Sequence, residues 1–198
     1  MGMARATRKS LGPADWTEAA LAALARGGVA AVAVEPLAKA LQTTKGSFYW
    51  HFADRNALLE ATLELWELRN TDRVMASLDA AADPQTRLRG LLDLAFRSVS
   101  DGTTDGAGTV ELALQASASQ RVVAAALERV TKRRVALMTS LYGELGLSPA
   151  AARNRALLAY TSYLGHAQLA HSTPLLLPRG RALATHVHQV VESLVELG

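Results

Sequence analysis

The stretch from Val34 to Phe52, VEPLAKALQTTKGSFYWHF, constrains the fold of this chain more than any other part of it. Leu37 and Ala38 fall on the apolar face of a first helix. Thr44 stands where the N-cap of a second helix is expected, with its hydroxyl placed to accept a hydrogen bond from the Ser47 N–H. The sequence therefore predicts two short helices joined by a tight turn.

The second of these helices, expected from Lys45 to Phe52, has two chemically different faces. Phe48 and Phe52 lie within about 40° of each other at about 100° per residue, so both can anchor the helix to a core. The remaining side chains point outward or to the flanks, and none of them is acidic. Hydroxyls, backbone N–H groups and a helix N-terminus bind phosphate oxygens, and a lysine can reach the edge of a guanine.

This outward face predicts a DNA contact surface. An alternative interpretation is a buried amphipathic helix that merely carries surface aromatics. We favour the DNA surface, because an exposed Tyr49-Trp50 pair beside Lys45 and His51 is costly without a partner.

The longer signature LAKALQTTKGSFYWHFADRNALLEA, from Leu37 to Ala61, resembles the helix-turn-helix of TetR-family (TetR/AcrR-like) transcriptional repressors. The resemblance is close over residues 11–66 and is limited to architecture elsewhere. It implies that the first residues of the second helix read bases and that the following ones hold the DNA backbone. The residues that match these roles are Thr44, Lys45, Gly46 and Ser47 for bases, and Tyr49, Trp50, His51 and Arg55 for phosphate and sugar.

The turn departs from the family pattern at Gln42, where glycine is usual. If the backbone there needs a positive φ, glutamine costs about 1 kcal/mol relative to glycine. We expect an adjusted turn rather than loss of the motif.

Helical patterns continue through the rest of the chain, without a repeat or a strand pattern. A first helix is expected between Pro13 and Gly27-Gly28, and a fourth from the Asp54 N-cap to about Ala80. Further helices are expected from Pro84 and near 110–117, 120–145, 150–171 and 179–197, with a loop at 101–109. The predicted fold is all-α with about nine helices. A three-helix head with a basic arm, residues 1–53, precedes a larger helical body, residues 54–198.

The net charge of +3 resides entirely in residues 1–50, since residues 51–198 carry equal numbers of basic and acidic side chains. An excess at the helix-turn-helix fits binding to a polyanion. The basic arm of residues 1–11 either reaches along DNA or is a solubilising tail. The run Lys132-Arg133-Arg134 is either a second DNA patch or a solvated face balanced by Glu128, and we favour the solvated face.

Two long final helices, about 149–171 and 179–197, suggest an interface. The resemblance implies a homodimer through a four-helix bundle, with a monomer core as the alternative. It also implies an unknown small-molecule effector inside the body. Candidate lining residues, each of which could be plain core instead, are Trp66, Phe96, Tyr142, Tyr160, Tyr163 and His166. An apolar or amphiphilic compound is expected rather than an anion, because no buried cation is evident from the sequence.

Catalysis is not expected, because no HExxH, P-loop, GxGxxG or GxSxG motif occurs and the five histidines are poorly aligned for a metal. No cofactor or metal is predicted. The absence of cysteine excludes disulfides and fits a reducing cytoplasm. The basic residues near the start lack the apolar run of a signal peptide, and no stretch is apolar enough to span a membrane.

Together these features predict a cytoplasmic repressor that binds a palindromic operator as a homodimer and is released by a ligand. Two other classes remain open. One is a helical interaction or ligand-carrier protein that keeps the motif without using it, and the other is an all-α enzyme with scattered catalytic residues. A steep salt dependence of duplex binding would distinguish the regulator from both.

Overall fold

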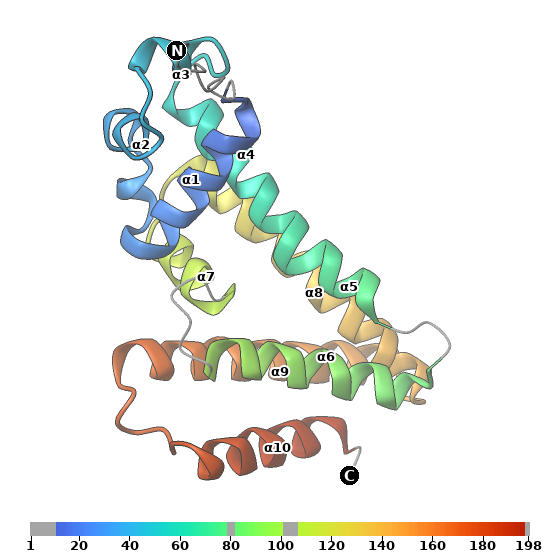
Figure 1. Ribbon diagram of the computed structural model, residues 1–198. Helices are drawn as coiled ribbons and strands as arrows, with labels where there is room; N and C mark the ends of the chain where they lie inside the picture. Colours follow the sequence, from blue (N-terminus) through green and yellow to red (C-terminus); the bar gives the residue numbers. More distant parts are fainter. Residues whose placement is uncertain (1–10, 79–81, 101–106, 197–198) are drawn as a thin grey trace, which may run out of the picture.

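The computed structural model describes residues 11–78, 82–100 and 107–196, and these contain helices and no strand (Figure 1). Counting α4, a π-helical turn and α5 as one continuous helix, the described residues form nine helices, which confirms the predicted all-α class. The basic arm, residues 1–10, and most of the loop expected at 101–109 lie outside the described residues.

The head consists of α1 (Pro13–Gly27), a 3₁₀ turn (Val29–Ala31), α2 (Val34–Ala40) and α3 (Lys45–Tyr49). At the start of α1 the Gly12 N–H donates to the Asp15 carboxylate at 2.8 Å. The helix ends as predicted at Gly28, whose φ of 67° is the left-handed conformation that glycine adopts without strain.

The turn between α2 and α3 has the strain that the sequence indicated. Gln42 has a φ of 53° and is the non-glycine residue with a positive φ in the described ranges. Directly after it, the Thr44 hydroxyl accepts from the Ser47 N–H at 3.3 Å and caps α3. The predicted helix-turn-helix is therefore formed, with the turn adjusted around a left-handed glutamine.

The helix that follows the head is less regular than its sequence pattern suggests. Asp54 caps α4 (Arg55–Glu67) by accepting from the Ala57 N–H at 2.9 Å. A π-helical turn (Leu68–Asp72) then leads into α5 (Arg73–Ser77). Because neither glycine nor proline marks this interruption, the sequence predicted a regular helix to about Ala80. Insertions of this kind often occur at functional sites.

The body contains α6 (Pro84–Ser100), α7 (Ala107–Gln115), α8 (Arg121–Glu144), α9 (Pro149–Ser172) and α10 (Arg181–Val195). The α4–α5 helix and α8 run side by side from the head to the far end of the molecule, where α6, α9 and α10 pack together (Figure 1). The predicted bounds hold within a few residues.

Two hydrophobic clusters hold the molecule together. The first joins the head to α4, α7 and the start of α8, and the second joins α6, the end of α8, α9 and α10. Trp66 of α4 and Val130 of α8 belong to the first cluster, whereas Met138 and Leu141 further along α8 belong to the second. The α4 helix therefore packs both against α1 of the head and against α8 of the body.

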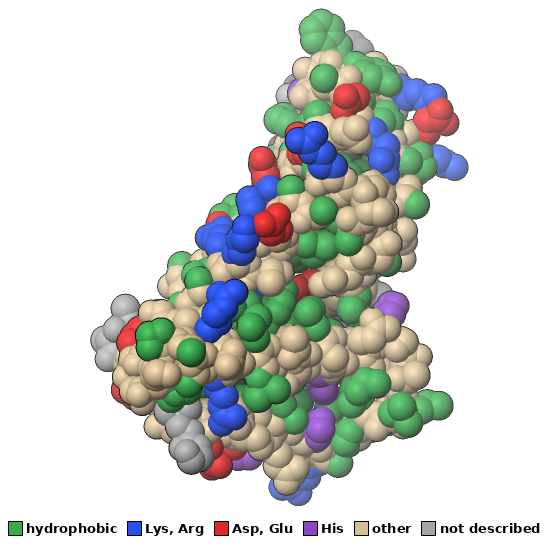
Figure 2. All heavy atoms as spheres, turned by 180° about the vertical axis from the view of Figure 1, so that it is seen from behind, with side chains coloured by type: hydrophobic (Ala, Val, Ile, Leu, Met, Phe, Trp, Pro, Cys, Tyr) green, Lys and Arg blue, Asp and Glu red, His purple; other side chains and the backbone are tan. Residues whose placement is uncertain are grey.

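Charged and hydrophobic side chains are unevenly spread over the surface. Seen from the side opposite to Figure 1, charged side chains are most frequent over the upper and middle parts of the molecule, whereas hydrophobic side chains lie at the top and over much of the lower part (Figure 2). The exposed leucines of this lower part belong to α9 and the segment after it, and are Leu157, Leu158, Leu169, Leu175 and Leu176. None of the described helices is long and apolar enough to cross a membrane.

Candidate nucleic-acid interface and ligand cavity

The α3 helix is anchored by the two phenylalanines that the sequence assigned to the core. Phe48 is fully buried and packs edge-on against Trp16 of α1, with ring centroids 5.3 Å apart. Phe52 is also buried and stacks on Phe48 at 5.6 Å. Aromatic contacts of this kind add rigidity beyond the area they bury.

On the opposite side of α3 the large aromatic side chains are exposed. The side chain of Trp50 is 88% exposed and that of Tyr49 is 62% exposed. Tyr49 directly follows the buried Phe48, and Trp50 lies two residues before the buried Phe52, so the helix period alone separates the two sets. The exposed indole and phenol at this short helix form an apolar surface of the kind that indicates a binding site.

The other residues predicted to read DNA lie on the same exposed side. Thr44, Lys45, Gly46 and His51 are exposed and Ser47 is half-buried. Lys45 forms an ion pair with Glu35 of α2, and both side chains remain largely in solvent. Such a pair is weak, so the lysine can exchange its partner at little cost.

Arg55 is placed differently from the rest of the predicted set. It is half-buried, and its guanidinium donates to the carbonyl oxygens of Val29 and Val32 at 2.6 Å each. In this structure Arg55 therefore ties the start of α4 to the connector between α1 and α2. His51 is similarly tied to the head, since its Nε2 lies 3.0 Å from the Leu11 carbonyl oxygen.

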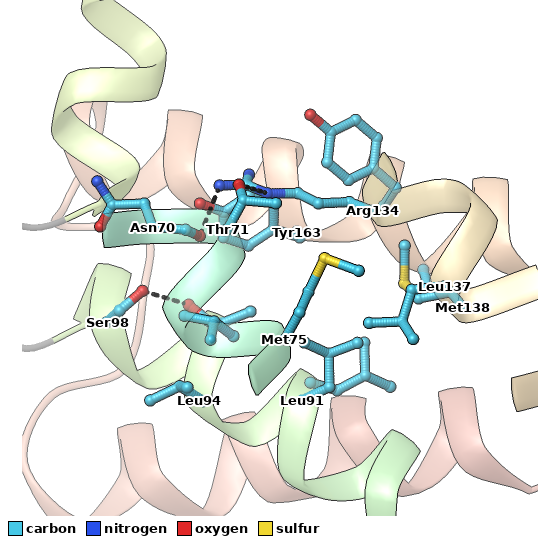
Figure 3. A pocket seen from close by; sticks show the side chains of 15 residues that line it. Asn70, Thr71, Met75, Leu91, Leu94, Ser98, Arg134, Leu137, Met138 and Tyr163 are labelled. Carbon is cyan, nitrogen blue, oxygen red and sulfur yellow. Dashed lines mark hydrogen bonds between the residues drawn. The ribbon is translucent and has the colours of Figure 1, made fainter. Parts of the chain in front are cut away.

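A cavity of about 250 Å³ lies in the body between α5, α6, α8 and α9 (Figure 3). Its polar end is formed by the π-helical turn and by Arg134, and its other end is lined by methionines and leucines. Of the six residues predicted to line a ligand site, the structure brings Tyr160 and Tyr163 to this cavity.

The other four predicted residues lie in the hydrophobic clusters around it. Phe96 packs edge-on against His166 at 5.4 Å, and both are buried. The hydroxyl of the buried Tyr142 donates to the Leu194 carbonyl oxygen at 2.8 Å. Trp66 is fully buried beneath Arg134, whose guanidinium carbon lies 5.9 Å from the centroid of its ring.

A buried network of charged and phenolic groups forms the floor of the cavity. The Arg134 guanidinium donates to the Glu111 carboxylate at 2.7 Å. The hydroxyls of Tyr160 and Tyr163 donate to the same carboxylate at 2.7 and 3.1 Å. Glu111 is only 1% exposed, so these contacts compensate for the burial of its charge.

This network corrects two sequence-based expectations. The basic run at 132–134 is not a uniformly solvated face: Lys132 pairs with Glu128 in solvent, but the Arg134 side chain is only 16% exposed. The expectation that no cation is buried was therefore wrong. Arg134 lies in phase with Leu127, Val130 and Leu141 on the buried stripe of α8, and this position was the available signal.

Burial and the neighbouring negative charge both raise the pKa of the two tyrosine hydroxyls in this network. Burial, with the nearby Glu111 charge, raises the pKa of Tyr160 to about 12 and raises the pKa of Tyr163 as well. Burial disfavours the charge of Arg134, but the Glu111 carboxylate and the two tyrosines together outweigh burial, and the pKa of Arg134 is raised. The network thus holds a charged Arg–Glu pair and two neutral phenols at ordinary pH.

The π-helical turn connects this network to the head. The Arg134 guanidinium donates to the Asn70 carbonyl oxygen at 3.1 Å and to the Thr71 hydroxyl at 3.2 Å. One residue earlier, Arg69 binds the carboxylate of Glu18 on α1 through two hydrogen bonds. A single turn of helix therefore contacts both the cavity wall and the first helix of the head.

Comparison with known proteins agrees with this arrangement. Residues 17–74 match the sequence profile of the family described as bacterial regulatory proteins, tetR family. The search of curated proteins returned no match.

Solved structures of similar fold cover nearly the whole chain. A TetR-family transcriptional regulator from Agrobacterium tumefaciens is 13% identical, with a TM-score of 0.75 over 91% of this chain and 96% of that one. FadR from Bacillus subtilis, solved with stearoyl-CoA, is 16% identical, with a TM-score of 0.70 over 92% and 97%. AibR, solved with isovaleryl coenzyme A and operator DNA, is 19% identical, with a TM-score of 0.65 over 92% and 95%.

A helix-turn-helix head on an all-helical body defines the class of helix-turn-helix transcriptional regulators. Within that class, residues 17–74 carry the N-terminal region of the TetR family, and the whole chain shares its fold with the solved TetR-family regulator from Agrobacterium tumefaciens. The chain is a DNA-binding transcriptional regulator.

Proposed function

We propose that the chain is a cytoplasmic repressor that binds a palindromic operator as a homodimer and leaves it when a small molecule enters the body. In this proposal residues 1–53 bind DNA, while residues 54–198 hold the ligand and the partner subunit. The protein has no catalytic role. The observation that carries the proposal is the exposed aromatic and hydroxyl-rich face of α3, fixed by two buried phenylalanines.

The DNA contact follows from which atoms this face presents. The Thr44 and Tyr49 hydroxyls and the free backbone N–H groups at the start of α3 suit phosphate oxygens, and Lys45 suits a guanine edge. Trp50 would pack on the sugar-phosphate backbone. Arg55 would exchange its carbonyl partners for a phosphate, or would serve DNA binding indirectly by placing α4 against the connector.

Dimer formation is supported by the exposed leucines of α9 and the segment after it. Leu157 and Leu158 lie on the outer face of α9, and Leu175 and Leu176 follow that helix. A hydrophobic face on α9 and the segment after it is suited to pairing with its own copy about a two-fold axis. A dimer presents two α3 helices, as reading of two half-sites requires.

Ligand release is supported by the contacts of the π-helical turn. A molecule in the cavity touches Asn70 and Thr71, and the neighbouring Arg69 holds the head through Glu18. Ligand binding lowers operator affinity only if the ligand prefers the arrangement of the head that does not fit DNA. The structures of FadR with stearoyl-CoA and of AibR with both isovaleryl coenzyme A and operator DNA support a ligand-responsive role.

Selection from a random duplex library, followed by titration of the selected duplex by fluorescence anisotropy, tests the proposal. We expect a palindromic sequence and one dimer per duplex. Tyr49→Ala should weaken binding to all duplexes about equally, because phosphate contacts carry no sequence information. Lys45→Ala should change the preferred sequence.

Lys132→Ala provides the matched control, since Lys132 is an exposed lysine with an acidic partner, like Lys45, but lies on α8. It should leave affinity and preference unchanged. Selection of no sequence above background, or equal losses for Lys132→Ala and Lys45→Ala, would reject the assigned surface.

A further inference from the structure

The charges and hydrogen-bond donors of the cavity wall determine which chemical class of ligand the cavity can bind. Among the described residues that line it, Arg134 carries the one formal charge, and Glu111 directly behind it cancels that charge. The rest of the wall is largely aliphatic and includes Met75, Leu91 and Met138 (Figure 3).

Arg134 offers hydrogen-bond donors that the protein does not use. A guanidinium has five N–H groups. Three of them donate, to Glu111, to Thr71 and to the Asn70 carbonyl oxygen. Each terminal nitrogen thus keeps one N–H without an acceptor in the described part of the chain. A mostly buried donor at a cavity wall favours a ligand atom that accepts.

The Glu111 carboxylate, in contrast, has no need of a ligand. It accepts from Arg134 and from the hydroxyls of Tyr160 and Tyr163. A ligand ammonium would meet the Arg134 charge before it met this carboxylate. A ligand carboxylate would place a second negative charge beside one guanidinium already paired, and neither charge could be fully compensated there.

From this balance we infer that the cavity binds a compact uncharged molecule, largely apolar, with one carbonyl-type acceptor that takes the free N–H groups of Arg134. The cavity of about 250 Å³ is smaller than the pockets of about 300–1,000 Å³ that hold drug-sized ligands, so a ligand of about ten non-hydrogen atoms fits. Ketones, esters, lactones and amides of that size have the required chemistry. The two methionines allow the apolar end to adapt to different chain shapes.

This inference rests on the proposed function, because it names the ligand class of the same body site. It also explains how a bound ligand can affect the head. The acceptor would sit beside the Asn70 carbonyl oxygen, which Arg134 also binds, so the ligand lies directly against the contact between α8 and the π-helical turn.

Isothermal titration of the full chain with octan-2-one, octanoate and octylamine tests the inference. We expect octan-2-one to bind at one site per subunit and to raise the melting temperature. The carboxylate and the amine should bind at least about tenfold more weakly, as expected for a buried charge without compensation. Octanoate binding as tightly as the ketone, or binding of none of the three, would overturn the inference.

Two alanines allow a matched test of location. Ala95 of α6 lines the cavity, whereas Ala76 of α5 is exposed and does not. Ala95→Phe should abolish octan-2-one binding, and Ala76→Phe should leave it unchanged. If Ala95→Phe does not fold, Leu94→Phe provides a second blocking variant, because Leu94 lines the cavity but is 45% exposed. Ketone binding that survives a folded blocking variant would place the site elsewhere.

The role of Arg134 is tested by Arg134→Lys, which keeps the charge next to Glu111 but loses the fork of donors. The variant should bind octan-2-one about tenfold more weakly, and its melting temperature without ligand shows whether it still folds. Unchanged ketone binding would exclude Arg134 as the ligand's partner. Operator affinity is measured in parallel, so that a failure to bind DNA counts against the proposed function and a failure to bind ketone counts against the inference.

Discussion

The outer face of α3 and the floor of the body cavity are both built from hydroxyls, aromatic rings and a basic side chain. They differ in the surroundings of these groups: solvent on α3, and other protein groups in the cavity. On α3 the side chains of Lys45, Tyr49 and Trp50 remain in solvent. In the cavity the Tyr160 hydroxyl and the Arg134 guanidinium donate hydrogen bonds to the buried Glu111 carboxylate. Polar groups left in water are available to a polyanion, whereas polar groups paired inside a body fix its shape and select a ligand.

Among the substitutions that test this comparison, removal of the buried Glu111 carboxylate should have the largest effect on stability. Glu111→Ala leaves the Arg134 charge and two phenol hydroxyls without their acceptor, so the free energy of unfolding should fall by about 3–5 kcal/mol. Chemical denaturation measures the loss. Glu111→Gln keeps an acceptor oxygen and should lose less. A loss below about 1 kcal/mol for Glu111→Ala would mean that the network is not a structural element.

Two adjacent residues of α3 should respond very differently to the same truncation. Phe48→Ala removes a fully buried ring and should lower the free energy of unfolding by about 3–5 kcal/mol. Tyr49→Ala removes a mostly exposed ring that packs edge-on against Phe48 at 5.1 Å, so it should lower the free energy of unfolding by about 1 kcal/mol at most. Thermal or denaturant unfolding compares the two variants, and similar losses would contradict the division of α3 into an anchored face and a free face.

Alkaline pH should destabilise the body through its buried phenols. Burial raises the pKa of Tyr142 and of Tyr160 to about 12, above the value of about 10 in an unfolded chain. The folded state therefore favours the protonated phenols. Below pH 10 the two phenols contribute fully to the free energy of unfolding. As the pH rises to about 12 this contribution is lost, which lowers the free energy of unfolding by roughly 1–2 kcal/mol for each tyrosine.

The pH effect is measured by denaturant unfolding between pH 8 and 12, together with the absorbance of tyrosinate. Tyr160→Phe, which removes the titrating hydroxyl, should flatten part of the decline. Stability that stays constant up to pH 12 would show that these phenols are not held neutral by the fold.

The smallest predicted effect is a gain in the head. Gln42 adopts a φ of 53°, which glycine tolerates better. Gln42→Gly should raise the free energy of unfolding by about 1 kcal/mol, and Gln42→Asn should give a smaller gain because asparagine accepts this conformation more readily than glutamine. A loss of stability on Gln42→Gly would show that the glutamine side chain makes a compensating contact.

The interface and the cavity differ in how far the sequence could predict them. The α3 face depends on neighbours within one helix, so the helical period was enough to separate Phe48 and Phe52 from Tyr49 and Trp50. The caps at Thr44 and Asp54 were equally local. Local rules thus account for the helices, for the head and for the exposed surface of the motif.

The cavity depends instead on contacts between residues far apart in the chain. Glu111 meets Arg134 and Tyr160 only because α7, α8 and α9 pack together, and no helical period encodes that meeting. The aromatic residues predicted as lining were chosen by type, and most of them fill the clusters around the cavity. The π-helical turn at Asn70 and Thr71 carries no glycine or proline signal, so it could not be predicted either.

The central claim is that the exposed face of α3 lies against a nucleic-acid duplex. Its most direct test is the affinity for the selected operator measured against salt concentration, for the unmodified chain and for Tyr49→Ala. We predict that the logarithm of the association constant falls linearly and steeply with the logarithm of salt, and that Tyr49→Ala weakens binding at every salt concentration. Affinity that does not depend on salt, or that Tyr49→Ala leaves unchanged, would contradict the account.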